Sequence, residues 1–255
     1  MRRAIAALGR CVRPTVLVGA PLVLSACASS FGVPDGATEQ GREINDLWGR
    51  FFVASLIVGG ITLALIAIAV VVFRRRRGDD DLPAQSEGNV PLEIVYTAIP
   101  VAIVVLLWSL SMTTENRVLE VSEHPDVTVE VEAFAWGWRF SYPDQGVELV
   151  SEPGTAGPQM VLPVGATTRI VLTSDDVIHS FYVPDFLFKR DAIPGRTWEF
   201  DLTPAETGVF EGACAEFCGL NHAYMRFTVK VVQPAEFTAW ASQAASAQTQ
   251  QEAAL

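Results

Sequence analysis

The residues of this sequence that could do chemistry are concentrated in one short stretch of its C-terminal half. Cys214, Cys218, His222 and Met225 follow the spacing Cys-x3-Cys-x3-His-x2-Met. Thiolate, imidazole and thioether together form a soft ligand set that suits copper, whereas a structural zinc site wants four strong ligands. Because the chain has only three histidines and four cysteines, this clustering predicts a copper site.

Two cysteines on one loop favour two metal ions over one. A mononuclear blue-copper site uses a single Cys with two His and a weak Met, whereas two thiolates can bridge a pair of ions. Each ion then needs one imidazole, and His222 supplies the first. His179 is expected to supply the second, because it follows a candidate strand at 168–173 whose end can present a ligand rigidly. His124 is expected to be an exposed histidine.

Weaker ligands complete the predicted pair. Met225 is the expected axial ligand of one copper, and the backbone carbonyl of Glu216 is expected to serve the other. The alternatives are simpler: core packing for Met225, a solvated acid for Glu216, and a Cys214–Cys218 disulfide, which an exported protein permits. The disulfide leaves the Met and both histidines unexplained.

The N-terminus is typical of an export signal. A basic region precedes an apolar run at 14–24 that is too short to span a bilayer, and Leu24-Ser-Ala-Cys27 resembles a bacterial lipobox. We therefore expect a signal peptide at 1–26, a lipidated Cys27 as the new N-terminus and an external linker at 27–45. An ordinary signal peptide with an incidental Cys is the alternative.

Two membrane helices are predicted next. Residues 51–73 carry no charge and are long enough for a hydrocarbon core of roughly 30 Å. The arginines at 74–77 mark the cytoplasmic side rather than a nucleic-acid patch. A second apolar run at 94–112 contains Pro100. The expected division is helix 1 at 46–78, a cytoplasmic loop at 79–90 and helix 2 at 91–113, with both flanking regions outside.

The remaining chain has the residue pattern of a β-domain. Apolar and polar residues alternate from Val127, and short strand candidates at 147–150, 168–173, 197–202 and 226–232 are separated by turn signals, which favours an antiparallel sandwich or barrel at 114–235. Residues 236–255 are expected to form a short helix and a frayed tail. From residue 113 onward, 20 Asp and Glu stand against 8 Lys and Arg. Such acidity excludes nucleic acid and attracts basic partners, or serves solubility alone.

The cysteine loop resembles the CuA loop of cytochrome c oxidase subunit II. The family pattern Cys-x-Glu-x-Cys-Gly-x-x-His-x-x-Met is met at every position, and the segments 176–184 and 189–196 resemble the family's first-histidine segment and the run that follows it. The resemblance covers about 46–235. It implies a two-helix transmembrane hairpin followed by an all-β cupredoxin-like Greek-key domain outside a bacterial plasma membrane. It also implies that two coppers are bound by His179, Cys214, Glu216, Cys218, His222 and Met225.

Further roles are implied by the resemblance. Trp136, in an aromatic segment at 133–142, would receive the electron, although Ala135, Gly137 and Arg139 depart from the family pattern there. A core position is the alternative, and it is expected for Trp138. The Glu216 carboxylate would help to hold magnesium at the contact with the catalytic subunit. Glu93 would lie near the cytoplasmic mouth of a proton channel, or would be an interfacial acid favoured by the helix dipole.

The implied function is electron transfer within a terminal oxidase. Cytochrome c would deliver electrons through Trp136 to the copper pair, which would pass them to haem in subunit I, where oxygen is reduced to water and protons are translocated. Subunits I and III are the implied partners. This chain lacks a Cys-x-x-Cys-His motif, so no haem is expected in it. A basic cytochrome c is expected to dock on acids flanking the His179 segment, namely Asp175, Asp176, Asp185 and Asp191.

Three other classes of protein share parts of this pattern. A quinol oxidase subunit II has the same architecture but lacks the copper ligands. A nitrous-oxide reductase has a CuA loop but is soluble and carries a second copper domain. A membrane-anchored copper-delivery lipoprotein is the non-enzymatic alternative, and it would purify without a haem-bearing partner.

Overall fold

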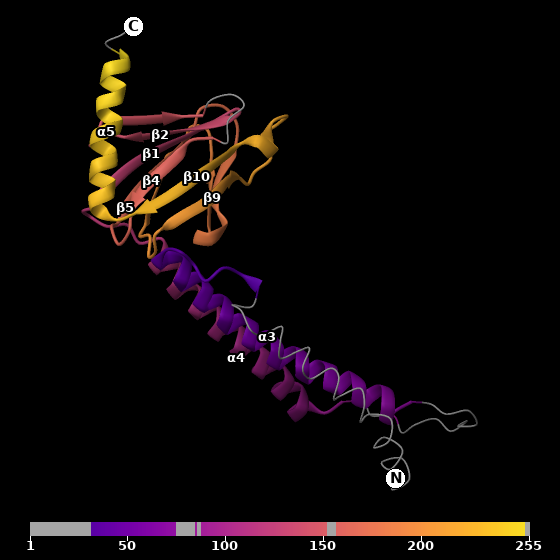
Figure 1. Cartoon of the computed structure of the whole chain (residues 1–255). Helices are drawn as coiled ribbons and strands as arrows, with labels where there is room; N and C mark the ends of the chain where they lie inside the picture. The colour runs from indigo at the N-terminus through magenta and orange to yellow at the C-terminus, as the bar shows by residue number, and fades with distance from the viewer. Residues whose placement is uncertain (1–31, 75–84, 86–87, 152–156, 253–255) are drawn as a thin grey trace, which may run out of the picture.

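A pair of long helices joined to a β-sandwich makes up most of the molecule (Figure 1). The computed structural model describes residues 32–74, 85, 88–151 and 157–252. The predicted signal peptide, Cys27 and Arg75 to Arg77 lie outside these residues, as does most of the predicted cytoplasmic loop. The expected two-helix hairpin followed by an all-β domain is confirmed.

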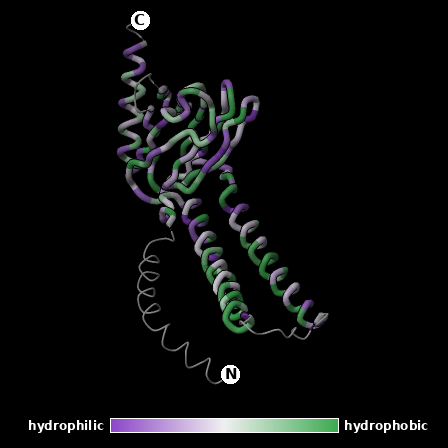
Figure 2. The backbone as a smooth tube through the Cα atoms, turned by 90° about the vertical axis from the view of Figure 1, so that its right-hand side faces the viewer, coloured by the Kyte–Doolittle hydropathy of each residue, from purple (hydrophilic) through white to green (hydrophobic). Residues whose placement is uncertain are grey.

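The helix pair consists of α3 (Glu39–Val72) and α4 (Val90–Val118). Their most apolar 18-residue windows have mean hydropathies of 2.7 and 2.3, and neither window is buried within the protein. Apolar residues cover both helices along most of their length (Figure 2). Because apolar surface of this length is stable only in a non-aqueous environment, both helices are suited to span a membrane.

The observed helix limits differ from the predicted ones. α3 begins at Glu39, inside the predicted linker, because the Thr38 hydroxyl caps it by accepting from the Gly41 N–H at 2.9 Å. It ends at Val72, before Arg74, rather than at 78. α4 continues beyond 113 to Val118. The prediction followed the apolar residues, whereas the polar ends of both helices continue past the membrane core.

The start of α3 is joined directly to the external domain. The Ala37 N–H donates to the Asp185 carbonyl at 2.8 Å, and the Ala37 carbonyl accepts from the Ala205 N–H at 2.8 Å. The Glu39 N–H donates to the Thr203 carbonyl at 3.0 Å. These backbone bonds join residues 37–39 to the external domain, so α3 begins within the segment 27–45 that was expected to be a linker.

Two five-stranded sheets form the sandwich. The first has the order β3 (Val147–Val150), β2 (Gly137–Tyr142), β1 (Val127–Phe134), β5 (Thr168–Ser174), β8 (Trp198–Leu202). The second has the order β4 (Gln159–Pro163), β10 (Arg226–Val232), β9 (Gly208–Cys214), β6 (His179–Val183), β7 (Phe188–Ala192). Each sheet contains one parallel pair, β1 with β5 and β4 with β10. All other neighbouring strands pair antiparallel, so the expected antiparallel sandwich is confirmed apart from these two pairs, which join strands distant in sequence.

An aromatic cluster fills the space between the sheets. The ring of Phe227 lies 5.1 Å from Trp138 and 5.0 Å from Phe181 between centroids, and all three side chains are fully buried. Gly212 faces this cluster, where a Cβ atom would stand 2.2 Å from the Phe227 ring. The core thus supports β6 and β9, the strands that carry the predicted ligands.

The C-terminal segment forms a longer element than predicted. α5 (Pro234–Glu252) packs along the sandwich (Figure 1). Its Trp240 ring lies 5.2 Å from the ring of Tyr142, and Phe237 is buried in the same contact. The domain therefore extends beyond 235. The many Ala, Gln and Ser residues of this segment obscured the two aromatic anchors in its first turns.

Candidate metal centre

Two neighbouring strands bring the predicted ligands together. β6 and β9 pair antiparallel with Phe181 opposite Cys214, so His179 at the start of β6 lies beside the end of β9. The loop that follows β9 carries Cys218, His222 and Met225 and is called the ligand loop below. It returns to the end of β9 and the start of β6. The Cys214 N–H donates to the Met225 carbonyl at 3.0 Å, and the Ala215 N–H donates to the Ser180 carbonyl at 3.1 Å.

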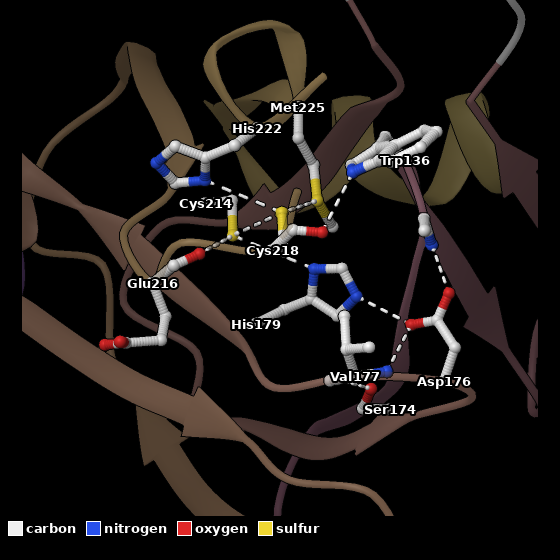
Figure 3. Close-up of polar contacts among 11 residues, drawn as sticks. Trp136, Ser174, Asp176, Val177, His179, Cys214, Glu216, Cys218, His222 and Met225 are labelled. Atoms are coloured by element: carbon white, nitrogen blue, oxygen red, sulfur yellow. Dashed lines mark hydrogen bonds and ion pairs between the residues drawn. The ribbon is translucent and has the colours of Figure 1, made fainter. Parts of the chain in front are cut away.

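The four strong donors lie around the sulfurs of Cys214 and Cys218 (Figure 3). The sulfurs of Cys214 and Cys218 are 3.8 Å apart. Nδ1 of His179 lies 3.8 Å from the Cys214 sulfur, and Nδ1 of His222 lies 3.5 Å from the Cys218 sulfur. Metal–nitrogen and metal–sulfur bonds of about 2.0 and 2.3 Å at near-tetrahedral angles place such donors about 3.5 Å apart. The residues therefore fit metal ions held between imidazole and thiolate.

The predicted weak ligands are in reach of the same sulfurs. The Met225 sulfur lies 3.8 Å from that of Cys218 and is buried, and the Glu216 carbonyl lies 3.2 Å from that of Cys214. Both cysteines are free thiols. Each pair of thiol and imidazole therefore has one weaker donor beside it, the Met225 thioether or the Glu216 carbonyl. This mixture of donors suits copper better than zinc.

The two thiols have opposite tendencies to ionise. Burial opposes ionisation of Cys214, but contacts with His179 and nearby backbone groups outweigh burial and lower the pKa of Cys214. Burial and the negative charge on Cys214 raise the pKa of Cys218. One thiolate is thus favoured, and the second proton is expected to leave only when metal ions compensate the charge.

His179 is held from its far side by an acid. The ring is fully buried, and its Nε2 lies 2.8 Å from the Asp176 carboxylate. Burial lowers the pKa of His179, but hydrogen bonds to Cys214 and Asp176 outweigh burial and raise it. Burial raises the pKa of Asp176, and bonds from His179 and two backbone N–H groups reverse this and lower it. The position of Asp176 three residues before the histidine was the available signal for this contact.

Trp136 lies directly on the ligand loop. Its indole N–H donates to the Cys218 carbonyl at 3.0 Å, and a Cβ atom at Gly219 would stand 3.1 Å from the ring. The side chain is 39% exposed, so it reaches from the sulfur cluster to solvent. Trp138 and Tyr142 are buried, which confirms the core position expected for Trp138.

The structure does not bring the four predicted docking acids together. Asp175 and Asp176 are exposed beside the start of β6. Asp191 pairs with the Lys189 ammonium at 3.0 Å. Asp185 lies at the opposite end of β6, where its carbonyl accepts from the residue before the α3 cap. Asp185 therefore belongs to the membrane-proximal end of the sandwich and not to the rim of the centre.

The remaining predicted residues lie apart from the sulfur cluster. The Glu216 carboxylate is 3.6 Å from the Lys189 ammonium, so a cation there would have to compete with Lys189. Glu93 is at the start of α4 and accepts from the Asn89 N–H at 3.2 Å, while the Asn89 side chain accepts from Leu92. This reciprocal cap is a structural reason for an acid at this position. His124 is exposed, as expected.

Sequence reasoning missed an apolar rim around the centre. Phe217, Leu220 and Tyr224 are each at least 79% exposed on the ligand loop. Val177 and Ile178 are exposed beside His179. Large apolar side chains on a soluble surface mark contacts with other proteins.

Comparisons with known proteins agree on one family. Residues 155–232 match the model described as "Cytochrome C oxidase subunit II, periplasmic domain", and residues 26–113 match the corresponding transmembrane domain. The chain is 39% identical to a probable cytochrome c oxidase subunit 2 of Streptomyces avermitilis, over 81% of this chain and 76% of the relative. It is 30% identical to cytochrome c oxidase subunit 2 of Mycobacterium bovis, over 89% and 78%. The solved periplasmic domain of subunit II from Bradyrhizobium japonicum is 38% identical, over 49% of this chain and 96% of that domain, with a TM-score of 0.45.

Proposed function

Because the chain belongs to the cytochrome c oxidase subunit II family, we propose that its sulfur cluster is a two-copper centre through which electrons from cytochrome c reach the oxidase. The observation that carries this proposal is that two imidazoles and a thioether each lie within 3.8 Å of one of two neighbouring thiols. The family is that of an oxidase, an enzyme of several subunits, so this chain acts together with partners.

Each residue of the centre has a distinct task in this proposal. Cys214 and Cys218 would hold the two coppers through their thiolates, and His179 and His222 would hold them through their imidazoles. Met225 and the Glu216 carbonyl are the weak ligands. The bound pair supplies a one-electron carrier whose shared charge keeps reorganisation small. The protein contributes rigid ligands, because β6, β9 and the closed loop leave little freedom to rearrange.

Electrons enter this centre through Trp136. The proposal is supported by the partly exposed indole ring and by its hydrogen bond to the Cys218 carbonyl. Those contacts connect the molecular surface to Cys218, which would hold the coppers. Haem in subunit I, where oxygen would be reduced, would receive the electrons from this centre. Trp138 and Tyr142 are buried and are not proposed as alternatives.

The donor docks around Trp136. The apolar rim residues provide contact area, and Asp175 contributes negative charge at the same edge of the domain. A basic cytochrome c fits such a surface, since long-range attraction accelerates its approach. Asp191 and Asp185 are not included, because one is paired with Lys189 and the other lies at the far end of β6.

The remaining roles are further proposals. Subunit III is a proposed partner, and the bacterial plasma membrane is the proposed location. Cys27 is the proposed lipidation site. The Glu216 carboxylate could take part in a magnesium site only if a partner's ligands draw it away from Lys189. For Glu93 the helix cap is the favoured role.

Purification with partners tests this function against copper delivery. The full chain, expressed in its own membrane with an affinity tag, is expected to bring down a haem-bearing subunit. The preparation should then show a reduced-minus-oxidised haem spectrum and oxidise reduced cytochrome c with consumption of oxygen. A copper-loaded chain that purifies alone, without haem or oxidase activity, would instead support the copper-delivery alternative.

A further inference from the structure

The Asp176 carboxylate has a more specific environment than a docking acid needs. Its Oδ1 lies 2.8 Å from Nε2 of His179 and accepts from the Val177 N–H at 2.6 Å. Its Oδ2 accepts from the Ala135 N–H at 2.7 Å. Figure 3 shows this carboxylate between the imidazole ring and the segment that carries Trp136. Both oxygens are therefore engaged with groups of the protein itself.

The first contact determines how His179 can bind a metal ion. An ionised carboxylate accepts hydrogen bonds only, so the proton of the neutral ring is held on Nε2. Nδ1 is then left with its lone pair directed at the Cys214 side of the cluster, 3.8 Å from that sulfur. A carboxylate behind a metal-binding imidazole also increases the basicity of the ring.

The bond from the Ala135 N–H to Asp176 holds the segment that carries Trp136, the proposed electron acceptor. Ala135 directly precedes Trp136, so its N–H bond to Asp176 holds the backbone of this segment. The indole N–H of Trp136 bonds the Cys218 carbonyl at the other end of the residue. Trp136 is thus anchored at its backbone through Asp176 and at its ring through the ligand loop.

We infer that Asp176 is a positioning residue that orients the His179 imidazole and the Trp136 segment together. The inference rests on the proposed function. It differs from the expectation from sequence, in which Asp176 was one of several equivalent acids. The adjacent Asp175 offers a matched comparison, because it is exposed and its backbone N–H bonds the Ala133 carbonyl.

Two substitutions of equal charge separate positioning from docking. Asp176→Asn keeps the size of the side chain, but the amide has only one oxygen that can accept where the carboxylate has two. Asp175→Asn removes the same charge one residue away. Both variants are made in the full chain within the purified oxidase. Copper affinity is measured by competition with a copper chelator, the copper spectrum by electron paramagnetic resonance, and the midpoint potential by redox titration.

Positioning predicts different results for the two variants. Asp176→Asn should weaken copper binding about 10- to 100-fold, change the hyperfine pattern and raise the midpoint potential, because a negative charge near the metal is lost. It should also lower kcat at saturating cytochrome c, since Trp136 is no longer held. Asp175→Asn should keep the wild-type spectrum and potential and raise only KM.

A third variant keeps the charge and changes only the geometry. Asp176→Glu moves the carboxylate outward by one methylene group, so positioning predicts an altered copper spectrum and a lower kcat. A wild-type spectrum, potential and kcat in Asp176→Glu would overturn the inference, as would an Asp176→Asn variant that matches Asp175→Asn in every measurement. A wild-type chain that binds no copper would instead refute the proposed function, which is a separate outcome. Thermal unfolding of the copper-free chains establishes that each variant folds.

Discussion

Replacing Trp136 is the perturbation that separates electron acceptance from the integrity of the copper centre. Its ring is 39% exposed, so roughly three-fifths of a surface of about 250 Å² is buried. At about 25 cal/mol per Å² this burial contributes at most about 4 kcal/mol, and the hydrogen bond to Cys218 adds about 1 kcal/mol. Trp136→Gln recovers part of both, because Gln has a methylene stem and an amide donor.

The expected cost of Trp136→Gln is therefore about 2–4 kcal/mol, against a total stability of about 5–15 kcal/mol for a typical domain. The domain should still fold and all of the proposed copper ligands are retained, so the copper spectrum should be close to wild type. Electron transfer from cytochrome c should nevertheless slow by orders of magnitude, because the variant lacks the Trp136 ring through which electrons are proposed to reach the copper centre. Donor affinity should change little, since indole carries no charge.

Stopped-flow reduction by cytochrome c is the assay, with wild type and variant oxidase measured side by side. Trp136→Phe is the matched control, because it retains an aromatic ring and loses only the indole N–H bond to Cys218. Its rate should lie between the other two. Electron transfer from copper to haem should survive in both variants. If Trp136→Gln is reduced at the wild-type rate, electrons enter elsewhere on the apolar rim and the reasoning is wrong.

Other consequences can be measured in the same preparations. Asp175→Asn should lower the bimolecular rate with cytochrome c at low salt and flatten its dependence on ionic strength, since the Debye length is only about 8 Å at physiological salt; a rate that is unchanged at every salt concentration would contradict docking at this edge. Gly219→Ala should displace the Trp136 ring, because the added Cβ meets it at 3.1 Å and the residue has a φ of 119°, and thermal unfolding should show a loss of about 1–3 kcal/mol. Cys27→Ser should abolish lipidation while the protein stays in the membrane, and mass spectrometry of the wild-type mature chain showing an unmodified Cys27 would refute the lipid anchor.

The proposed copper ligands could be identified as candidates from the sequence because their types are rare and their spacing is short. Cys214, Cys218 and His222 sit on one loop, so their proximity needed no knowledge of the fold. His179 was the harder choice. It depended on excluding His124, and the pairing of β6 with β9 supplies the physical reason for it.

Contacts between distant segments were not predictable in the same way. The Ala135 N–H and the Asp176 carboxylate are 41 residues apart in sequence and meet only because β1 and β5 lie side by side in parallel. The polar start of α3 was expected to be a linker because its residues are not apolar. Its stability comes instead from the Thr38 cap and from bonds to the sandwich. An apolar pattern does not report such contacts. The aromatic anchors of α5 were hidden in an Ala- and Gln-rich segment for the same reason.

The most direct test of the central claim is the electron paramagnetic resonance spectrum of the oxidised, copper-loaded full chain, recorded with a measurement of copper per chain. One unpaired electron shared equally by two copper nuclei should give a seven-line hyperfine pattern and a ratio near two. Cys218→Ser removes one of the two proposed thiolate ligands, so the seven-line pattern should change or disappear. A four-line spectrum with one copper per wild-type chain would contradict the two-copper centre.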